Sequence, residues 1–204
     1  IVSNFIIADN SGDDGGGARL YEADVTFTQG VFTRNEAREA GGGVHIAVGA
    51  TRIEQSIVAS NLAGEGGGGV HEYMEADIAV SWTDSVANSP ADYSGMVDPT
   101  GVDGNVSVSP EFLDIDVADW PLDWDLHLST GSPLIDAGNP SVLDPDSSTS
   151  DIGAYGGSNA DTWDLDHDGW YEWWQPGPYD HVTYPAQGWD CDDGDDTVYP
   201  GQGC

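Results

Sequence analysis

The sequence has 204 residues and a formal net charge of −33, because 37 acidic residues stand against 4 basic ones. Nucleic acids and anionic membrane surfaces are bound through Lys and Arg, so this charge argues against both partners. No apolar run approaches the roughly 20 residues of a membrane-spanning helix. The hydrophobic content of 38% and the 8 tryptophans exceed what an acidic disordered segment carries.

The chain opens on a strand-like run at residues 1–7, with neither an initiator Met nor a signal peptide. We therefore expect a fragment or processed product of a longer protein. The sequence has no lysine, is rich in Gly and Asp, and carries its two cysteines near one end. This composition favours an exported protein that is extracellular or at the cell surface.

Runs of three glycines recur at a constant step in the first half of the chain. The three glycines directly before residues 18, 44 and 70 start at Gly15, Gly41 and Gly67, which are 26 residues apart, and one further glycine, Gly66, precedes the third set. The same shift aligns apolar positions such as Val31 and Ile57, and the segments between the runs are short and β-rich. A unit of this size cannot bury its own apolar side, so neighbouring units must stack.

About 26 residues with two or three short strands predict one coil of a parallel β-helix, so the expected fold class is all-β. Equivalent residues of successive coils should then form ladders. We expect one ladder inside the coils, one on the outer face and one at a corner where side-chain amides bond each other. These ladders are Ala18, Val44 and Val70 inside; Arg19, His45 and His71 outside; and Asp9, Asn35 and Asn61 at the corner.

The glycines before an aliphatic position, with an Asn after each apolar triplet, resemble the right-handed β-helix repeats of bacterial secreted and surface proteins, including the polymorphic outer-membrane protein type. A longer match lies between residues 104 and 157, with Ser109-Pro110-Glu111-Phe112, Gly131-Ser132-Pro133-Leu134 and Asp151-Ile152-Gly153-Ala154. The resemblance implies an outer-membrane-associated protein and an irregular cap over the open edge of the solenoid. We divide the chain into coils (1–103), a cap (104–157) and an acidic module (158–204).

The acidic module contains two aspartate clusters. In the first, Asp164, Asp166 and Asp168 alternate before Gly169, and Glu172 follows. Carboxylates at positions 1, 3 and 5 of a tight loop point to one centre, where the carbonyl of Trp170 adds a ligand. Oxygen ligands favour Ca²⁺, so we expect one or two structural Ca²⁺ ions as the cofactor. The alternative is that these aspartates merely solvate a loop.

The first cluster is not an EF-hand, because Gln175 stands where a bidentate carboxylate is needed. The second cluster offers the missing oxygens from Asp190, Asp192, Asp193, Asp195 and Asp196. Together the clusters resemble the MopE-type metal-binding motif of secreted and outer-membrane proteins. The resemblance implies main ligands at Asp164, Asp166, Asp168, Asp190, Asp192 and Asp193, with Asp195 and Asp196 next.

Cys191 and Cys204 could have one of three roles. A disulfide between them would close a loop of about 14 residues and add roughly 3 kcal/mol to stability. They could instead bind zinc with His167 or His181, or one of them could pair with a cysteine that is missing from this sequence. We expect the disulfide.

No catalytic constellation stands out. Stacked His45 and His71 follow from the repeat register more readily than from catalysis, and no carboxylate pair is singled out for glycoside hydrolysis. We therefore expect a non-catalytic extracellular structural or adhesion protein, a β-helix shaft with a Ca²⁺-stabilised C-terminal module in a surface filament or assembly. Expected partners are calcium, other surface proteins or polysaccharide, and further copies through the β-helix edge. The alternatives are a polysaccharide lyase or glycoside hydrolase whose catalytic coils are missing here, and a carbohydrate-binding module that uses the Trp-rich tail.

Overall fold

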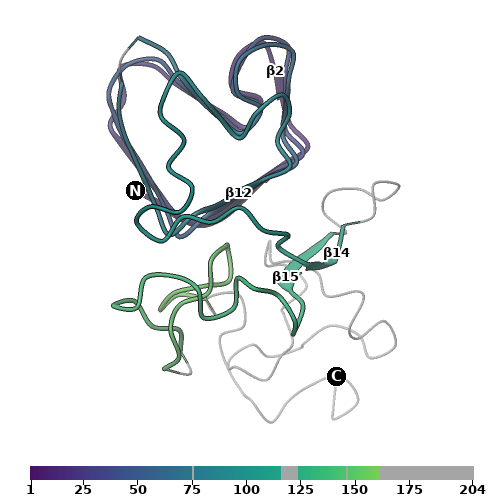
Figure 1. Cartoon of the computed structure of the whole chain (residues 1–204), viewed down its shortest axis with the longest axis vertical. Helices are drawn as coiled ribbons and strands as arrows, with labels where there is room; N and C mark the ends of the chain where they lie inside the picture. Colours follow the sequence, from purple (N-terminus) through teal and green to yellow (C-terminus); the bar gives the residue numbers. More distant parts are fainter. Residues whose placement is uncertain (75, 116–123, 146, 161–204) are drawn as a thin grey trace, which may run out of the picture.

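The computed structural model describes residues 1–74, 76–115, 124–145 and 147–160. All regular elements in these ranges are strands, and they include no helix that could cross a membrane. The strands form a parallel β-helix of about 4 turns with a repeat of about 26 residues. Figure 1 shows successive coils lying over one another along the axis of view. The predicted fold class and repeat length are therefore confirmed.

Three parallel sheets form the walls of the coils. Sheet A contains β1 (Val2–Ala8), β4 (Val25–Thr33), β7 (Ala50–Glu54), β8 (Ile57–Ala59), β11 (Asp77–Ser81) and β12 (Asp84–Val86). Sheet B contains β2 (Ser11–Gly12), β5 (Glu36–Ala37) and β9 (Leu62–Ala63). Sheet C contains β3 (Ala18–Leu20), β6 (Val44–Ile46), β10 (Val70–Glu72) and β13 (Tyr93–Ser94).

The first coil is one residue shorter than the repeat in the sequence suggests, so it pairs with the second coil at a step of 25 residues along sheets A and B. Ile6 pairs with Val31, whereas Val31 pairs with Ile57. Phe5 therefore faces Gly30, and a Cβ at that glycine would overlap the Phe5 ring. The shorter first coil thus places the aromatic ring of Phe5 over a residue that leaves room for it.

The interior of the coils is a continuous apolar core. The rings of Phe5, Phe27 and Phe32 contact one another with centroid separations of 5.0 to 5.5 Å. From sheet C, Val44 and Val70 are fully buried in the same cluster, and Ala18 packs against it. The predicted inner ladder of these three residues is therefore confirmed, and stacking of the coils supplies the burial that one coil alone lacks.

A ladder of asparagine side chains crosses all four turns at the corner between sheets A and B. The backbone N–H and Nδ2 of Asn35 both donate to Oδ1 of Asn61, at 2.9 and 3.0 Å. Asn61 repeats both bonds to Oδ1 of Asn88, each at 2.9 Å. The Nδ2 groups also bond backbone carbonyls inside the corner, as Asn61 does with Phe32 at 3.0 Å.

The predicted ladder was wrong in its first member. Asn10, not Asp9, donates to Oδ1 of Asn35, from its backbone N–H at 3.1 Å and from Nδ2 at 3.0 Å. Asp9 instead belongs to the set of residues that stand one position before each ladder asparagine. These residues have left-handed backbones with φ between 55° and 58°: Asp9, Arg34, Ser60 and Ala87. The one-residue shortening of the first coil produces this shift.

The region predicted as a cap has two parts. Residues 103–108 continue over the last coil, where Val106 bridges Asp84 and Asn105 accepts a bond from the Thr83 N–H. Residues 124–145 and 147–160 lie along the flank of the coils, below β12 in Figure 1. There β15 (Asp125–Leu128) pairs antiparallel with β14 (Phe112–Asp114).

The flank segment completes a second apolar core on the outer side of sheet A. Val31 and Ile57 project from the coils into a cluster with Trp124, Leu126, Leu134, Ile152 and Ala154. Hydrogen bonds also attach the flank segment to the coils. Asn4 donates to the Ala154 carbonyl at 3.0 Å, and the Gly153 N–H donates to the Gln55 carbonyl at 3.0 Å.

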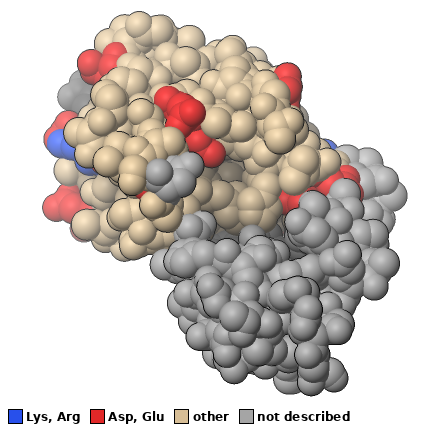
Figure 2. Space-filling view, turned by 90° about the horizontal axis from the view of Figure 1, so that it is seen from below, with Lys and Arg blue, Asp and Glu red and all other residues tan. Residues whose placement is uncertain are grey.

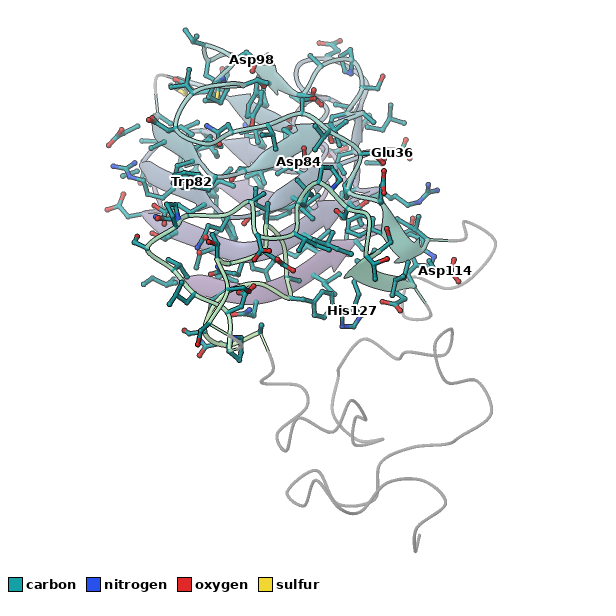
Figure 3. The ribbon with its side chains drawn as sticks, turned by 60° about the horizontal axis from the view of Figure 1, so that its bottom comes forward. Glu36, Trp82, Asp84, Asp98, Asp114 and His127 are labelled. Atoms are coloured by element: carbon teal, nitrogen blue, oxygen red, sulfur yellow. The ribbon has the colours of Figure 1, made fainter. Side chains whose placement is uncertain are left out.

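A carboxyl group is buried where the last coil meets this flank. Asp84 occupies the row of Ile57 and Val31 and is 0% exposed (Figure 3). Its Oδ1 accepts the Val108 N–H at 2.9 Å, while Oδ2 has no hydrogen-bond partner among the described residues. Burial raises the pKa of Asp84 to about 7, because the charged form loses its hydration.

We expect Asn61→Ala to lower the free energy of unfolding by about 3 kcal/mol or more, because it leaves buried donors of Asn35 and the Phe32 carbonyl without partners. Asn10→Ala is the matched control, since Asn10 is exposed and ends the ladder, and it should cost about 1 kcal/mol or less. Urea denaturation of both variants measures the difference. Equal losses would show that the ladder does not act as a buried network.

We also expect Asp84→Asn to remove a pH dependence of stability. The raised pKa means that Asp84 favours folding as the neutral acid, so its contribution is complete below about pH 4 and is lost as the pH rises through 7. At pH 8 the variant should be more stable than the unaltered chain by on the order of 3 kcal/mol, and at pH 4 the two should be nearly equal. Urea denaturation at both pH values measures this, with exposed Asp98→Asn as the control. A constant difference across pH would contradict it.

Candidate functional site

The predicted metal site and disulfide lie outside the described residues. This holds for the ligand candidates Asp164, Asp166, Asp168, Trp170, Glu172, Asp190, Asp192, Asp193, Asp195 and Asp196, and for Cys191 and Cys204. Both stay predictions. Among the residues that the structure does describe, no three His, Cys, Asp or Glu side chains are placed to hold a metal ion.

The candidate site lies on the outer face of sheet C, in a pocket of about 450 Å³. Charged, imidazole and phenol side chains line it, chiefly Asp14, Arg19, Tyr21, Glu39, His45, Glu65, His71 and Tyr73. They come from the first three coils, so the pocket exists only when the coils are stacked. We call it the sheet C pocket.

The central row of the pocket is the predicted outer ladder. Arg19 pairs with His45, and His45 pairs with His71, because β3, β6 and β10 lie in register. Side chains alternate along a strand, so these residues point outward when their neighbours Ala18, Val44 and Val70 point into the core. The predicted outer ladder is thus confirmed. The pocket encloses it more deeply than the sequence indicates, since His45 is only 5% exposed.

A second row lies two residues further along the same strands. Tyr21, Ala47 and Tyr73 follow the paired residues Leu20, Ile46 and Glu72, with backbone bonds continuing from Ala47 to Leu20 and from Tyr73 to Ile46. Ala47 is 2% exposed, whereas Tyr21 and Tyr73 are 62% and 54% exposed. The two tyrosines therefore stand on either side of a small residue, about 10 Å apart along the backbone stack.

His45 is the most deeply placed titratable group of the pocket. Its ring lies 5.1 Å from the His71 ring and 6.0 Å from the Tyr73 ring, measured between centroids. Burial lowers its pKa, and the nearby Asp14 charge opposes this only in part. The imidazole is therefore neutral at neutral pH. Its Nδ1 lies 3.8 Å from Asp14 Oδ1 and has no hydrogen-bond partner in the described part of the chain.

The other two members of the row are held by neighbours. His71 Nδ1 lies 2.6 Å from Ser94 Oγ, and burial lowers the pKa of His71 as well. The Arg19 guanidinium lies 3.6 Å from the Asp14 carboxylate, and its side chain is about half exposed. Such a solvent-exposed ion pair is weak. The row thus presents one weakly held cation and two neutral imidazoles to the pocket.

Carboxylates surround this row. Asp14, Glu39 and Glu65 line the pocket against a single lining guanidinium, that of Arg19. A nearby arginine outside the pocket, Arg38, bonds Glu39 at 2.9 Å and Asp13 at 2.8 Å. On the face drawn in Figure 2, acidic residues likewise outnumber the basic ones, and they form separate groups. The negative potential of the pocket is therefore part of a wider excess of acid.

Sequence reasoning identified the Arg19–His45–His71 row but missed the tyrosine row and Asp14. A signal for the tyrosines was present, because Tyr21, Ala47 and Tyr73 keep the 26-residue step. Asp14 carries no such repeat signal. It reaches the pocket because its loop between β2 and β3 folds beside His45.

A second polar group occurs in the flank segment. The buried Asp125 and the ring of His127 lie 2.6 Å apart, and that ring stacks on Tyr155 at 3.8 Å. Figure 3 shows His127 and Asp114 on the two antiparallel strands β15 and β14. This cluster joins the hairpin to the end of the segment, whereas the sheet C pocket is a cavity open to a ligand.

Comparisons with family models, curated proteins and solved structures found no match to this chain. The resemblances to polymorphic outer-membrane protein repeats and to the MopE-type motif therefore stay predictions.

Proposed function

We propose that this chain is part of a non-catalytic extracellular adhesion protein, whose β-helix shaft binds a saccharide in the sheet C pocket. The observation that supports this most is the pair of exposed tyrosines, Tyr21 and Tyr73, beside a row of polar side chains. Aromatic faces pack against the apolar faces of a sugar ring, and polar groups orient its hydroxyls. The pocket volume of about 450 Å³ is within the range of small-molecule sites.

The shaft suits this role because it holds the pocket rigidly. The central row of the pocket, Arg19, His45 and His71, comes from strands whose register is fixed by backbone pairing, and the residues next to this row in the strands pack into the apolar core. A pre-organised site loses little conformational entropy when a ligand binds. A surface filament or assembly would repeat such sites and gain avidity from them.

We expect Tyr73→Ala and Tyr21→Ala each to weaken saccharide binding by about tenfold or more, because each removes one aromatic wall. The measurement is a glycan array followed by calorimetry on the best ligand. Leu62→Ala is the matched control, since Leu62 is an apolar residue 45% exposed on sheet B. If no saccharide binds, or the three variants lose affinity equally, the proposal fails.

A polysaccharide-active enzyme is the second candidate. The neutral imidazole of His45 near the Asp14 carboxylate is an arrangement that general-base chemistry also uses. Chromatography of the same saccharide incubations separates the two functions. Shortened products that disappear in His45→Gln would favour the enzyme, and intact saccharide would favour the adhesion protein.

We also propose that the aspartate clusters of residues 158–204 bind Ca²⁺ as a structural cofactor. The support is the spacing of the carboxylates in the sequence. Ion binding would neutralise side chains that otherwise repel each other, so it would be coupled to folding of the module.

Calorimetry should therefore show Ca²⁺ binding by the full chain, and Asp166→Asn should weaken it by about tenfold. Asp98→Asn is the control, because Asp98 lies outside the module. A melting transition of the module should rise in Ca²⁺ and fall in chelator. No heat of binding, with a melting curve that chelator leaves unchanged, would refute the site.

A further inference from the structure

Equivalent positions of three successive coils supply the described residues that line the sheet C pocket. The central row and the tyrosine row each contribute three residues, one from each coil. The other lining residues come from two positions between sheets B and C, and they also stand 26 residues apart: Asp14, Ala40 and Gly66 at one position, and Glu39 and Glu65 at the other. The pocket is therefore a groove whose sides run from coil to coil, parallel to the axis of the solenoid.

The groove has an acidic edge and an aromatic edge. In the second and third coils, the chain passes first through a glutamate, then through a histidine of the central row and last through the tyrosine row. The Glu65 N–H bonds the Glu39 carbonyl at 2.6 Å, so the two glutamates stand one coil apart. Tyr21 and Tyr73 are 62% and 54% exposed, with the small Ala47 between them. A ligand in the groove therefore meets carboxylate oxygens along one side and phenol rings along the other.

Contacts along the groove repeat at the spacing of the coils, which is about 4.8 Å. The backbones of Tyr21 and Tyr73 are two spacings apart, about 10 Å. An extended peptide does not fit this repeat, because its side chains return to the same face about every 6.8 Å. Nucleic acid would be repelled by the acidic edge and by the net charge of −33.

A chain of pyranose sugars joined by equatorial 1,4-linkages does fit the repeat. Each ring advances such a chain by close to one coil spacing, and the rings form a flat ribbon with apolar faces and hydroxyl edges. Successive rings are turned over, so every second ring presents the same face. Tyr21 and Tyr73 likewise stand at every second coil, where each could pack on the same face of a ring. Hydroxyls along the ribbon edge could donate to Glu39 and Glu65.

We propose that the sheet C pocket binds an uncharged, equatorially 1,4-linked polysaccharide as an extended chain parallel to the solenoid axis, with one sugar ring on each of three coils. This inference rests on the proposed saccharide function and names its ligand class and its direction. The ligand is uncharged because the glutamates and Asp14 would repel a uronate. The middle ring covers Ala47, and the outer two rings pack on Tyr21 and Tyr73.

The experiment is calorimetry of the full chain with oligosaccharides of one to six sugars. The probes are the β-1,4-linked oligomers of glucose, of mannose and of N-acetylglucosamine, with maltohexaose as the axially linked comparison. At least one β-1,4 series should bind about tenfold more tightly as a trisaccharide than as a disaccharide, because the third ring reaches the second tyrosine. Longer oligomers should gain little more, and maltohexaose, whose chain curves, should bind at least tenfold more weakly.

Variants of the two tyrosines test the direction of the chain. Tyr21→Ala and Tyr73→Ala should each cost the trisaccharide about tenfold, whereas the disaccharide should lose only about twofold because it can move to the remaining tyrosine. Leu62→Ala on sheet B is the matched control and should leave both affinities unchanged. Unchanged circular dichroism and melting curves show that each variant is folded.

Other outcomes overturn the inference in distinguishable ways. Affinity that does not rise from one to three sugars, maltohexaose binding as tight as that of the β-1,4 hexamers, or equal losses for the two lengths in the tyrosine variants refutes the extended chain. The saccharide function then still stands. Binding of another saccharide on a glycan array, with none of the three β-1,4 series bound, has the same meaning. A lack of binding to every saccharide refutes both the inference and the saccharide function.

Discussion

The structure depends on the requirement that each coil place its residues over the matching residues of the next coil. Parallel backbone pairing sets this register, and the asparagine ladder enforces it at one corner, because a slip would leave buried amides without partners. The apolar interior follows from the same register, since Val44 lies against Val70 and Phe5 over Gly30. The sheet C pocket follows from it too, because no single coil contains more than part of its wall.

Much of this could be predicted from the sequence because repetition makes register visible. The glycine runs and the valines after them identify the coils, the inner ladder and the Arg19–His45–His71 row. The first coil was misaligned at one corner, where Asn10 rather than Asp9 joins the ladder. A repeat of constant length could not foresee that the first coil is one residue shorter than the others before it reaches sheet C.

Features without repetition were much harder to predict. The depth of His45 depends on Tyr73 and His71 packing around it, and the role of Asp14 depends on how one loop folds. The flank segment also has no internal period, so its packing on Val31 and Ile57 could not be read from patterns. The two outward-facing apolar residues look like ordinary core positions in the sequence, and only the fold shows that sheet A is covered on both faces.

The asparagine ladder also has a direction, and its last member matters for that reason. Every amide along it donates toward the next coil, and the series closes where Asn88 donates to Oδ1 of Asp92, from Nδ2 at 2.8 Å and from the backbone N–H at 3.1 Å. A carboxylate accepts hydrogen bonds but has no N–H to pass on. Asp92 therefore ends the ladder. It has a second carboxylate oxygen where an asparagine would have its NH₂ group, so it cannot donate to a further coil.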